Sequence, residues 1–237
     1  MRAHERRTEI RRICAEAELE TVFQPMIELG SKHCVAYEAL TRFPGETHTT
    51  SEWFADATEL GVGADLELAA VRSALAHLED FPPGALLSIN VSPGVAVTGE
   101  FLELVAPVAH RLIVELTEHE PVEEYDALSD ALKYLRSLGA RIAVDDVGAG
   151  FSSLRHILRL SPDILKLDLS LTHGIETDSG SRALTSALID FADNTGALIT
   201  AEGIETEGEL ELLRELGIDH GQGFLLGRPE PLVAHLQ

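Results

Sequence analysis

The feature that most constrains the fold is a regular alternation of apolar, strand-like segments with segments of helical periodicity. Strands are expected over residues 21–29, 34–40, 85–92, 111–118, 140–146, 163–168, 197–202 and 220–224. Helices are expected near residues 51–60, 63–78, 100–106, 123–138, 154–160, 180–195 and 206–216. Strands joined by helical crossovers run parallel, so the sequence predicts an α/β fold.

The first two expected strands differ from the others because only a short turn at Gly30-Ser31 separates them. This spacing predicts an antiparallel hairpin. Pro25 lies within the first strand and has no amide hydrogen to donate. We therefore expect this strand to be an edge strand or an irregular one.

Polar or charged residues stand at the C-terminal ends of most expected strands. They are Glu38, Asn90, Glu115, Asp145, Lys166, Glu202 and Gln222. In a closed (β/α) barrel the strand ends converge on one rim, which is where active sites of such barrels lie. An open doubly wound sheet, the alternative, would spread them along an edge. The pattern favours a single barrel over residues 21–237.

Residues 1–20 are rich in Arg and Glu and predict a solvated helix with charge pairs four residues apart, serving as a linker or dimer helix. Farther along, Ser51 is expected to cap one helix, and Thr206 with Glu209 forms a capping-box pattern for another.

Charge and composition exclude several classes of function. The formal net charge of −22 disfavours binding to long nucleic acids, whereas a small anionic substrate is compatible if a local cation inverts the field. No apolar run approaches the ~20 residues that cross a bilayer, and no signal-type segment begins the chain, so we expect a cytoplasmic protein without membrane contact. Cys14 and Cys34 are expected to be reduced.

The strongest chemical signal is the adjacent pair Asp145-Asp146, followed by Gly148 and Gly150. Two neighbouring ionised carboxylates repel each other unless a cation lies beside them, which suggests a metal site. A turn that caps the strand and the next helix is the alternative, since Asp and Gly are common turn residues. Oxygen ligands without a His or Cys cluster favour Mg²⁺ or Mn²⁺ over zinc.

The strand-end residues suffice for two ions. Glu38, Asn90, Glu115 and Asp145 could hold one, and Asp145, Asp146 and Glu202 a second, at the separation of about 3.5–4 Å used in two-metal attack on phosphoesters. Lys166 and Asp168, two residues apart on one expected strand, should face the same way. Lys166 could hold the attacking water or neutralise phosphate charge; a structural ion pair is the alternative.

The same residues resemble the motifs of the EAL domain family of bacterial cyclic di-GMP phosphodiesterases, in order over residues 20–232. The similar segments are Gln24-Pro25, Glu38-Ala39-Leu40 with Arg42, Asn90-Val91-Ser92, Glu115-Leu116-Thr117-Glu118, Asp145-Asp146 with Gly148, Gly150, Ser152 and Ser153, Lys166-Leu167-Asp168, Ala201 to Thr206, and Gln222-Gly223-Phe224.

This resemblance implies a (β/α)₈ barrel with an antiparallel first strand, and hydrolysis of cyclic di-GMP to linear pGpG with Mg²⁺ or Mn²⁺. It assigns the two sets of metal ligands named above and gives Lys166 and Glu202 the handling of the attacking water. It implies a homodimer and a loop anchor at Glu118. Substrate contacts are implied for Gln24, Leu40, Arg42, Asp168, Glu205 and Gln222.

Three residues depart from the usual family pattern: Val147, Ala149 and Phe151. None is a ligand position, so they bear on regulation and turnover. Two other functions stay open. A catalytically silent cyclic di-GMP receptor would be expected to lack a ligand, and this chain lacks none. An enolase-type barrel enzyme with Mg²⁺ would have no evident use for the Asp pair and its glycine loop. Calcium is expected to bind but to support little turnover.

Overall fold

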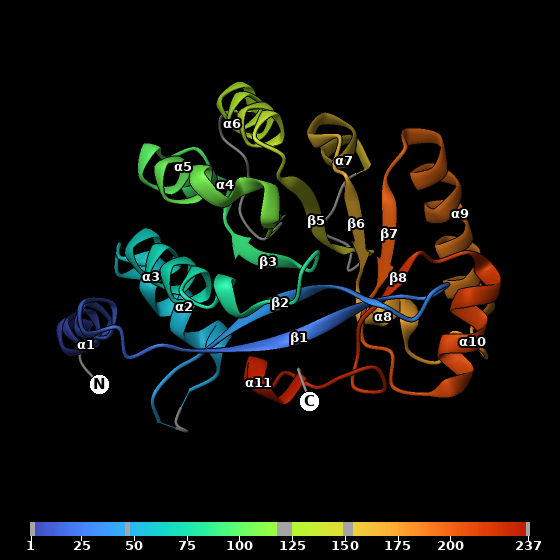
Figure 1. Ribbon diagram of the computed structural model, residues 1–237, viewed down its shortest axis with the longest axis horizontal. Coiled ribbons are helices and arrows are strands. Elements are labelled where there is room, and N and C mark those ends of the chain that lie inside the picture. The colour runs from blue at the N-terminus through green and yellow to red at the C-terminus, as the bar shows by residue number, and fades with distance from the viewer. Residues whose placement is uncertain (1–2, 46–47, 118–124, 149–153, 236–237) are drawn as a thin grey trace.

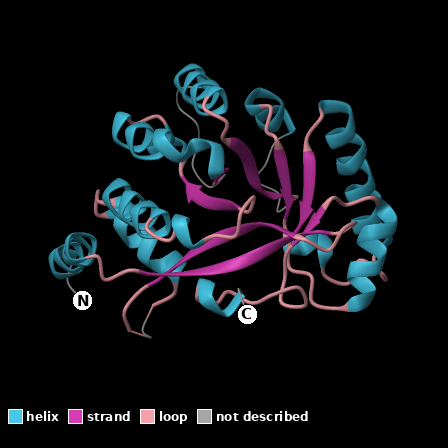
Figure 2. Ribbon diagram, viewed as in Figure 1, coloured by secondary structure: helices cyan, strands magenta, loops and turns pink. Residues whose placement is uncertain are grey.

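A computed structural model of the chain describes residues 3–45, 48–117, 125–148 and 154–235. Within these residues the strands close into one barrel in sequence order (Figures 1 and 2). They are β1 (Glu20–Glu28), β2 (Cys34–Arg42), β3 (Leu86–Val91), β4 (Leu112–Leu116), β5 (Arg141–Val147), β6 (Ile164–Leu167), β7 (Leu198–Ala201) and β8 (His220–Gly221). The closed topology confirms the predicted barrel.

Helices surround the barrel and fill the crossovers between strands (Figure 2). The α-helices are α1 (Ala3–Glu16), α2 (Thr50–Glu59), α3 (Gly63–Leu75), α4 (Pro93–Ala96), α5 (Gly99–Val105), α6 (Tyr125–Ser137), α7 (Leu154–Leu160), α8 (Leu169–Thr172), α9 (Ser179–Thr195), α10 (Glu207–Leu216) and α11 (Leu232–His235). Two 3₁₀ turns, η1 (Leu78–Asp80) and η2 (Ala106–Arg111), complete the set. None of these helices has both the length and the apolar character to cross a bilayer.

Strand directions agree with the predicted hairpin. β1 pairs antiparallel with both β2 and β8, and the remaining neighbours pair in parallel. The pairing of β1 with β8 is limited to Ile27 and Glu28, and Phe23 forms a separate bridge to Glu230. Pro25 lies between these contacts, where β1 needs no amide donor. The predicted irregularity of the first strand is confirmed.

Two apolar clusters pack against the barrel sheet, and a third lies between α1, α2 and α3. The large core lies between strands and surrounding helices and includes Leu87, Val114 and Leu165. A smaller cluster, which includes Met26 and Ile113, fills the barrel interior. Inward-facing positions closer to the strand C-termini carry polar side chains instead, so the polar site lies above this apolar layer.

Helix starts show which capping predictions hold. Thr206 and Glu209 form the predicted capping box of α10. The prediction for Ser51 is wrong, because α2 begins one residue earlier and Thr49 caps it, with Glu52 completing a capping box. Thr49 is the favoured cap because Glu52, three residues later, accepts a hydrogen bond from the Thr49 amide.

The N-terminal helix is less exposed than predicted. Arg12 and Glu16 form the expected surface pair at 2.8 Å. Arg6, Ile10 and Ile13 are nevertheless buried, since α1 packs on α2 and α3 (Figure 1). The assignment of residues 1–20 as a linker or dimer helix stays a prediction. Cys14 and Cys34 are both free thiols, in line with the predicted reduced state.

Candidate active site

The strand ends bring most of the predicted site residues into one connected cluster. Direct hydrogen bonds or ion pairs link Gln24, Glu38, Asn90, Glu115, Asp145, Lys166, Glu202 and Gln222. These residues come from all eight strands or from the position that follows a strand. The barrel rim is therefore the candidate site, as the sequence predicted.

Lys166 lies at the centre of this cluster and is fully buried. Its Nζ is 2.6 Å from Oε2 of Glu115 and 2.6 Å from Oε1 of Glu202. Asp145 Oδ1 lies at 3.2 Å and Glu38 Oε2 at 3.3 Å. One ammonium thus faces four carboxylates. If all four are ionised, the negative charge exceeds the positive, and the cluster favours an additional cation.

Amide side chains hold Glu38 in place. Asn90 Nδ2 donates to Oε1 at 2.8 Å, and Gln222 Nε2 donates to Oε2 at 2.8 Å. Gln222 also donates to Gln24 Oε1 at 3.0 Å, and Gln24 in turn donates to the carbonyl of Gly227. These bonds fix the orientation of the carboxylate and leave it little rotational freedom.

The Asp pair reaches the site through a break in β5. Adjacent residues of a regular strand point to opposite faces. Asp146 has a φ of 53°, and the pairing of β5 with β6 shifts between Val144 and Val147. This bulge turns both aspartates toward the site, so the prediction that the strand ends at the pair is wrong: β5 continues to Val147. Bulges of this kind are common near active sites.

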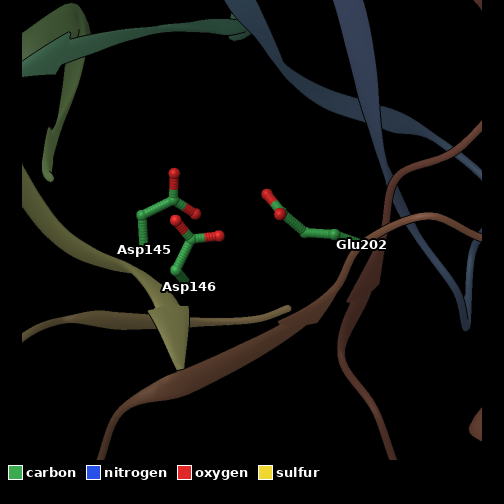
Figure 3. Close-up of side chains that lie close together, drawn as sticks. All are labelled: Asp145, Asp146 and Glu202. Carbon is green, nitrogen blue, oxygen red and sulfur yellow. The ribbon is translucent and has the colours of Figure 1, made fainter. Parts of the chain in front are cut away.

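Asp145, Asp146 and Glu202 form an oxygen triad that could hold a divalent metal ion. One oxygen from each residue lies within 4.8 Å of the others, and the side chains point toward one another (Figure 3). Among the residues described, this is the group of acidic, His or Cys ligands that meets such spacing. Asp145 Oδ1 is buried and accepts no hydrogen bond of good geometry, although Lys166 Nζ lies 3.2 Å away, so it still has room for a metal ligand bond. In the other predicted set, Glu38, Glu115 and Asp145 contact Lys166, and Asn90 contacts Glu38.

Burial and mutual repulsion shape the protonation of the cluster. Burial, followed by repulsion from Glu38, raises the pKa of Glu115 to about 8. Burial also raises the pKa of Glu202 well above its usual range. For Glu38 burial acts in the same direction, but the Lys166 ammonium and the hydrogen bonds from Asn90 and Gln222 together outweigh it, and the pKa of Glu38 is lowered. Without a metal ion Glu115 therefore retains its proton at neutral pH.

Ser88 belongs to the site and was missed from the sequence. It is fully buried on β3, two residues before Asn90, and its hydroxyl donates to Oε1 of Glu115. A hydroxyl in an apolar strand, on the same face as a predicted ligand, is the signal that could have identified it.

Four predicted substrate residues lie outside this cluster. Leu40 lines a cavity together with Asn90. Arg42 is the exposed last residue of β2. Asp168 was predicted to lie in the strand that holds Lys166, and this is wrong: β6 ends at Leu167. Asp168 instead caps α8, and its side chain accepts a hydrogen bond from the amide of Ser170. Glu205 is exposed, 3.9 Å from His173 Nε2.

The loop that carries Val147, Ala149 and Phe151 is described only at its start. Val147 is buried, and Gly148 has a φ of 108° with Leu171 packed where a Cβ would lie. Glu118, the predicted loop anchor, lies outside the described residues, as do Ala149 and Phe151.

Comparison with known proteins extends these findings. A family model described as the EAL domain matches residues 7–229. The bifunctional diguanylate cyclase/cyclic di-GMP phosphodiesterase MucR of Pseudomonas aeruginosa is 35% identical over 166 residues, which cover 70% of this chain and 22% of MucR. The chain spans between 22% and 39% of the length of such curated relatives.

Solved structures show the same architecture. The EAL enzyme Bd1971, with cAMP and cyclic di-GMP bound, matches with a TM-score of 0.88 at 26% identity, covering 99% of this chain and 68% of that one. Klebsiella pneumoniae BlrP1 in a manganese and cyclic di-GMP complex matches with a TM-score of 0.79 at 28% identity, covering 90% and 56%. BlrP1 has also been solved with calcium and cyclic di-GMP.

Proposed function

Because the chain belongs to the EAL domain family, we propose that it is a metal-dependent phosphodiesterase that hydrolyses one phosphodiester bond of cyclic di-GMP to give linear pGpG. One observation carries the proposal: Asp145, Asp146 and Glu202 form an oxygen triad next to a buried lysine. Oxygen-rich sites of this kind suit Mg²⁺ or Mn²⁺. Family membership argues against the enolase-type alternative.

The proposal places two divalent ions at the barrel rim. Asp145, Asp146 and Glu202 would hold one, and Glu38, Asn90, Glu115 and the shared Asp145 would hold the other. When bound, such ions would lower the pKa of a water molecule and polarise the phosphate oxygens. For the second set to act, the Lys166 ammonium has to move away from some of the carboxylates that it now contacts.

The chain's own groups have distinct roles in this proposal. Lys166 and Glu202, 2.6 Å apart, would orient the attacking water, and the Glu202 carboxylate would accept its proton. Lys166 would also offset charge that develops on the phosphate oxygens. Arg42 would contact a phosphate from the barrel rim. The remaining predicted substrate contacts are Gln24, Leu40, Asp168, Glu205 and Gln222, with Glu118 as the loop anchor.

A product assay tests the proposal. Purified protein is incubated with cyclic di-GMP and Mn²⁺, and the nucleotides are separated by chromatography. We expect pGpG to appear, and Glu202→Gln to abolish it while Glu28→Gln, at the opposite end of the barrel, leaves the rate unchanged. Binding without pGpG would establish the silent receptor instead. Neither binding nor hydrolysis would overturn both.

Replacing Mn²⁺ by Ca²⁺ in this assay tests the metal chemistry. We expect cyclic di-GMP to bind but to be hydrolysed very little, because calcium takes longer and looser coordination. Robust hydrolysis with calcium would contradict the two-metal arrangement. The homodimer and the cytoplasmic location stay predictions.

A further inference from the structure

The N-terminal helix α1 is anchored to the barrel wall by a small core of its own. Ile10 and Ile13 are fully buried against Trp53, Leu66 and neighbouring apolar residues of α2 and α3. This core is distinct from the one that lies behind the barrel strands. At the left of Figure 1, α1 lies beside α2 and α3. The helix is therefore a docked element of the fold.

Arg6 provides a specific contact at this interface. Its guanidinium carbon lies 3.4 Å from the centre of the Trp53 ring, and its Nε lies 2.7 Å from Oδ2 of Asp56. The residue is only 5% exposed. A planar cation stacked on an indole and paired with a carboxylate is among the stronger arrangements available to arginine.

Trp53 also contacts the residue that follows the end of β2. The Phe43 ring stacks on Trp53 at 4.8 Å with an interplanar angle of 9°. Phe43 directly follows Arg42, the last residue of β2. Phe43 also meets Phe54 edge to face at 5.8 Å. A continuous stack thus runs from α1, through Trp53, to the residue next to the proposed phosphate contact.

A second link joins the same two elements nearer the site. The hydroxyl of Thr50, in the first turn of α2, donates to the carbonyl of Thr41 at 3.1 Å. Leu40, Phe54 and Asn90 line one cavity between β2, α2 and β3. We call Thr41–Phe43 together with Thr50–Phe54 the β2–α2 corner. Movement of α2 at this corner would displace both the rim and the cavity wall.

We propose that Arg6 is a positioning residue: by stacking on Trp53 it fixes the β2–α2 corner, and with it Arg42, in the geometry that binds the anionic substrate. The proposal rests on the phosphodiesterase function proposed above. Arg6 itself does not touch the substrate. Docking of α1 and binding at the rim are then coupled, and each must strengthen the other to the same extent.

Steady-state kinetics with cyclic di-GMP and Mn²⁺ test this role. We expect Arg6→Ala to raise KM about tenfold with little change in kcat, because the lost contacts position a binding residue and not the reacting groups. Arg6→Lys keeps the charge but loses the planar stack. Its KM should lie between those of the wild type and Arg6→Ala. Arg7→Ala, an exposed arginine on the same helix, is the matched control and should leave both constants unchanged.

A second variant separates positioning from folding. Phe43→Leu interrupts the stack beyond Trp53 and leaves the contacts of Arg6 with Trp53 and Asp56 in place. We expect it to raise KM as Arg6→Ala does, while the melting temperature stays close to that of the wild type. A KM unchanged in both Arg6→Ala and Phe43→Leu would overturn the proposal, as would an equal loss of kcat in both.

Trp53 offers a readout that does not depend on turnover, because it is the only tryptophan in the chain. Titration of wild-type protein with cyclic di-GMP and Ca²⁺ should change its emission, and Arg6→Ala should weaken the binding that this change reports. A wild type that neither binds nor hydrolyses cyclic di-GMP refutes the proposed function. If the wild type binds and hydrolyses cyclic di-GMP but Arg6→Ala binds it as tightly as the wild type does, only the role of Arg6 is refuted.

Discussion

Nζ of Lys166 lies 2.6 Å from Oε2 of Glu115, although the two side chains are 1% and 0% exposed. Removing both groups from water is costly, and a buried pair persists only with good geometry and further hydrogen bonds. Ser88 supplies one such bond to Glu115, and Glu202 lies equally close to Lys166. The ammonium therefore offsets the charge of several carboxylates at once. A structural ion pair would require only one of them.

The first prediction concerns Lys166→Met, which keeps much of the side-chain volume but removes the charge. We expect kcat for cyclic di-GMP to fall by about 100-fold or more, with a smaller effect on KM, because the ammonium acts on charge that develops in the transition state. Steady-state kinetics at saturating Mn²⁺ measure both constants.

Lys133→Met is the control for this experiment, since Lys133 is an exposed lysine paired with Asp130 on α6. It should leave both constants unchanged. If Lys166→Met lowers stability but not kcat, the structural ion-pair role is correct and the catalytic one is not.

The second prediction concerns pH and stability without metal. Burial raises the pKa of Glu115 to about 8, whereas in the unfolded chain this carboxyl titrates near its usual 4.5. Between these values the folded protein keeps a proton that the unfolded chain releases. The contribution of Glu115 to the free energy of unfolding should therefore fall as pH rises from about 4.5 to 8 and level off above that. Urea titrations in the presence of EDTA measure it.

The control is Glu115→Gln, which should make this fall smaller. Glu202, whose pKa burial also raises, acts in the same direction, and His220, whose pKa burial lowers, acts in the opposite one. Both titrate in the wild type and in the variant, so the difference between the two proteins isolates Glu115. Metal binding requires the carboxylate form, so Mn²⁺ should raise the melting temperature more at pH 8 than at pH 6. A metal effect independent of pH would place Glu115 outside the metal site.

Much of the site was predictable because strand period and strand order fix where side chains point. Glu38, Asn90 and Glu115 each lie near the C-terminal end of an expected apolar strand, and parallel strands bring such ends together whatever their separation in sequence. The position of Asp146 was not predictable in the same way. Strict alternation would turn it away from Asp145, and only the left-handed backbone at Asp146 reverses this.

The burial of α1 could not be predicted from the sequence either. Its arginines and glutamates suggest a solvated helix, and Ile10 and Ile13 are the large aliphatic side chains among them. Their partners Trp53 and Leu66 lie more than 35 residues away on α2 and α3. The contact between α1 and Trp53 on α2 is a tertiary contact, and the local periodicity of the sequence carries no information about it.

The third prediction concerns Ser88→Ala. The variant removes a buried hydroxyl that donates to Glu115 and leaves that carboxylate without one of its partners. We expect the protein to lose about 2 kcal/mol of unfolding free energy at pH 9, where Glu115 is ionised, and less at pH 6. Ser137→Ala, which removes an exposed hydroxyl on α6, should change stability by under about 0.5 kcal/mol. Equal losses at both pH values would argue against a bond to the ionised carboxylate.

The last prediction separates the two roles of Asp146, its backbone conformation and its carboxylate. Asparagine tolerates the left-handed region as aspartate does, so Asp146→Asn should leave the melting temperature nearly unchanged in EDTA. Its amide is a weaker ligand than a carboxylate, so Mn²⁺ affinity measured by calorimetry should fall at least about tenfold, with activity recovering only at higher Mn²⁺. Asp146→Ala adds strain of roughly 1 kcal/mol and should lower both quantities. Asp130→Asn, on the surface of α6, should change neither. Unaltered Mn²⁺ affinity in Asp146→Asn would remove Asp146 from the metal site and leave the bulge of β5 as a structural feature alone.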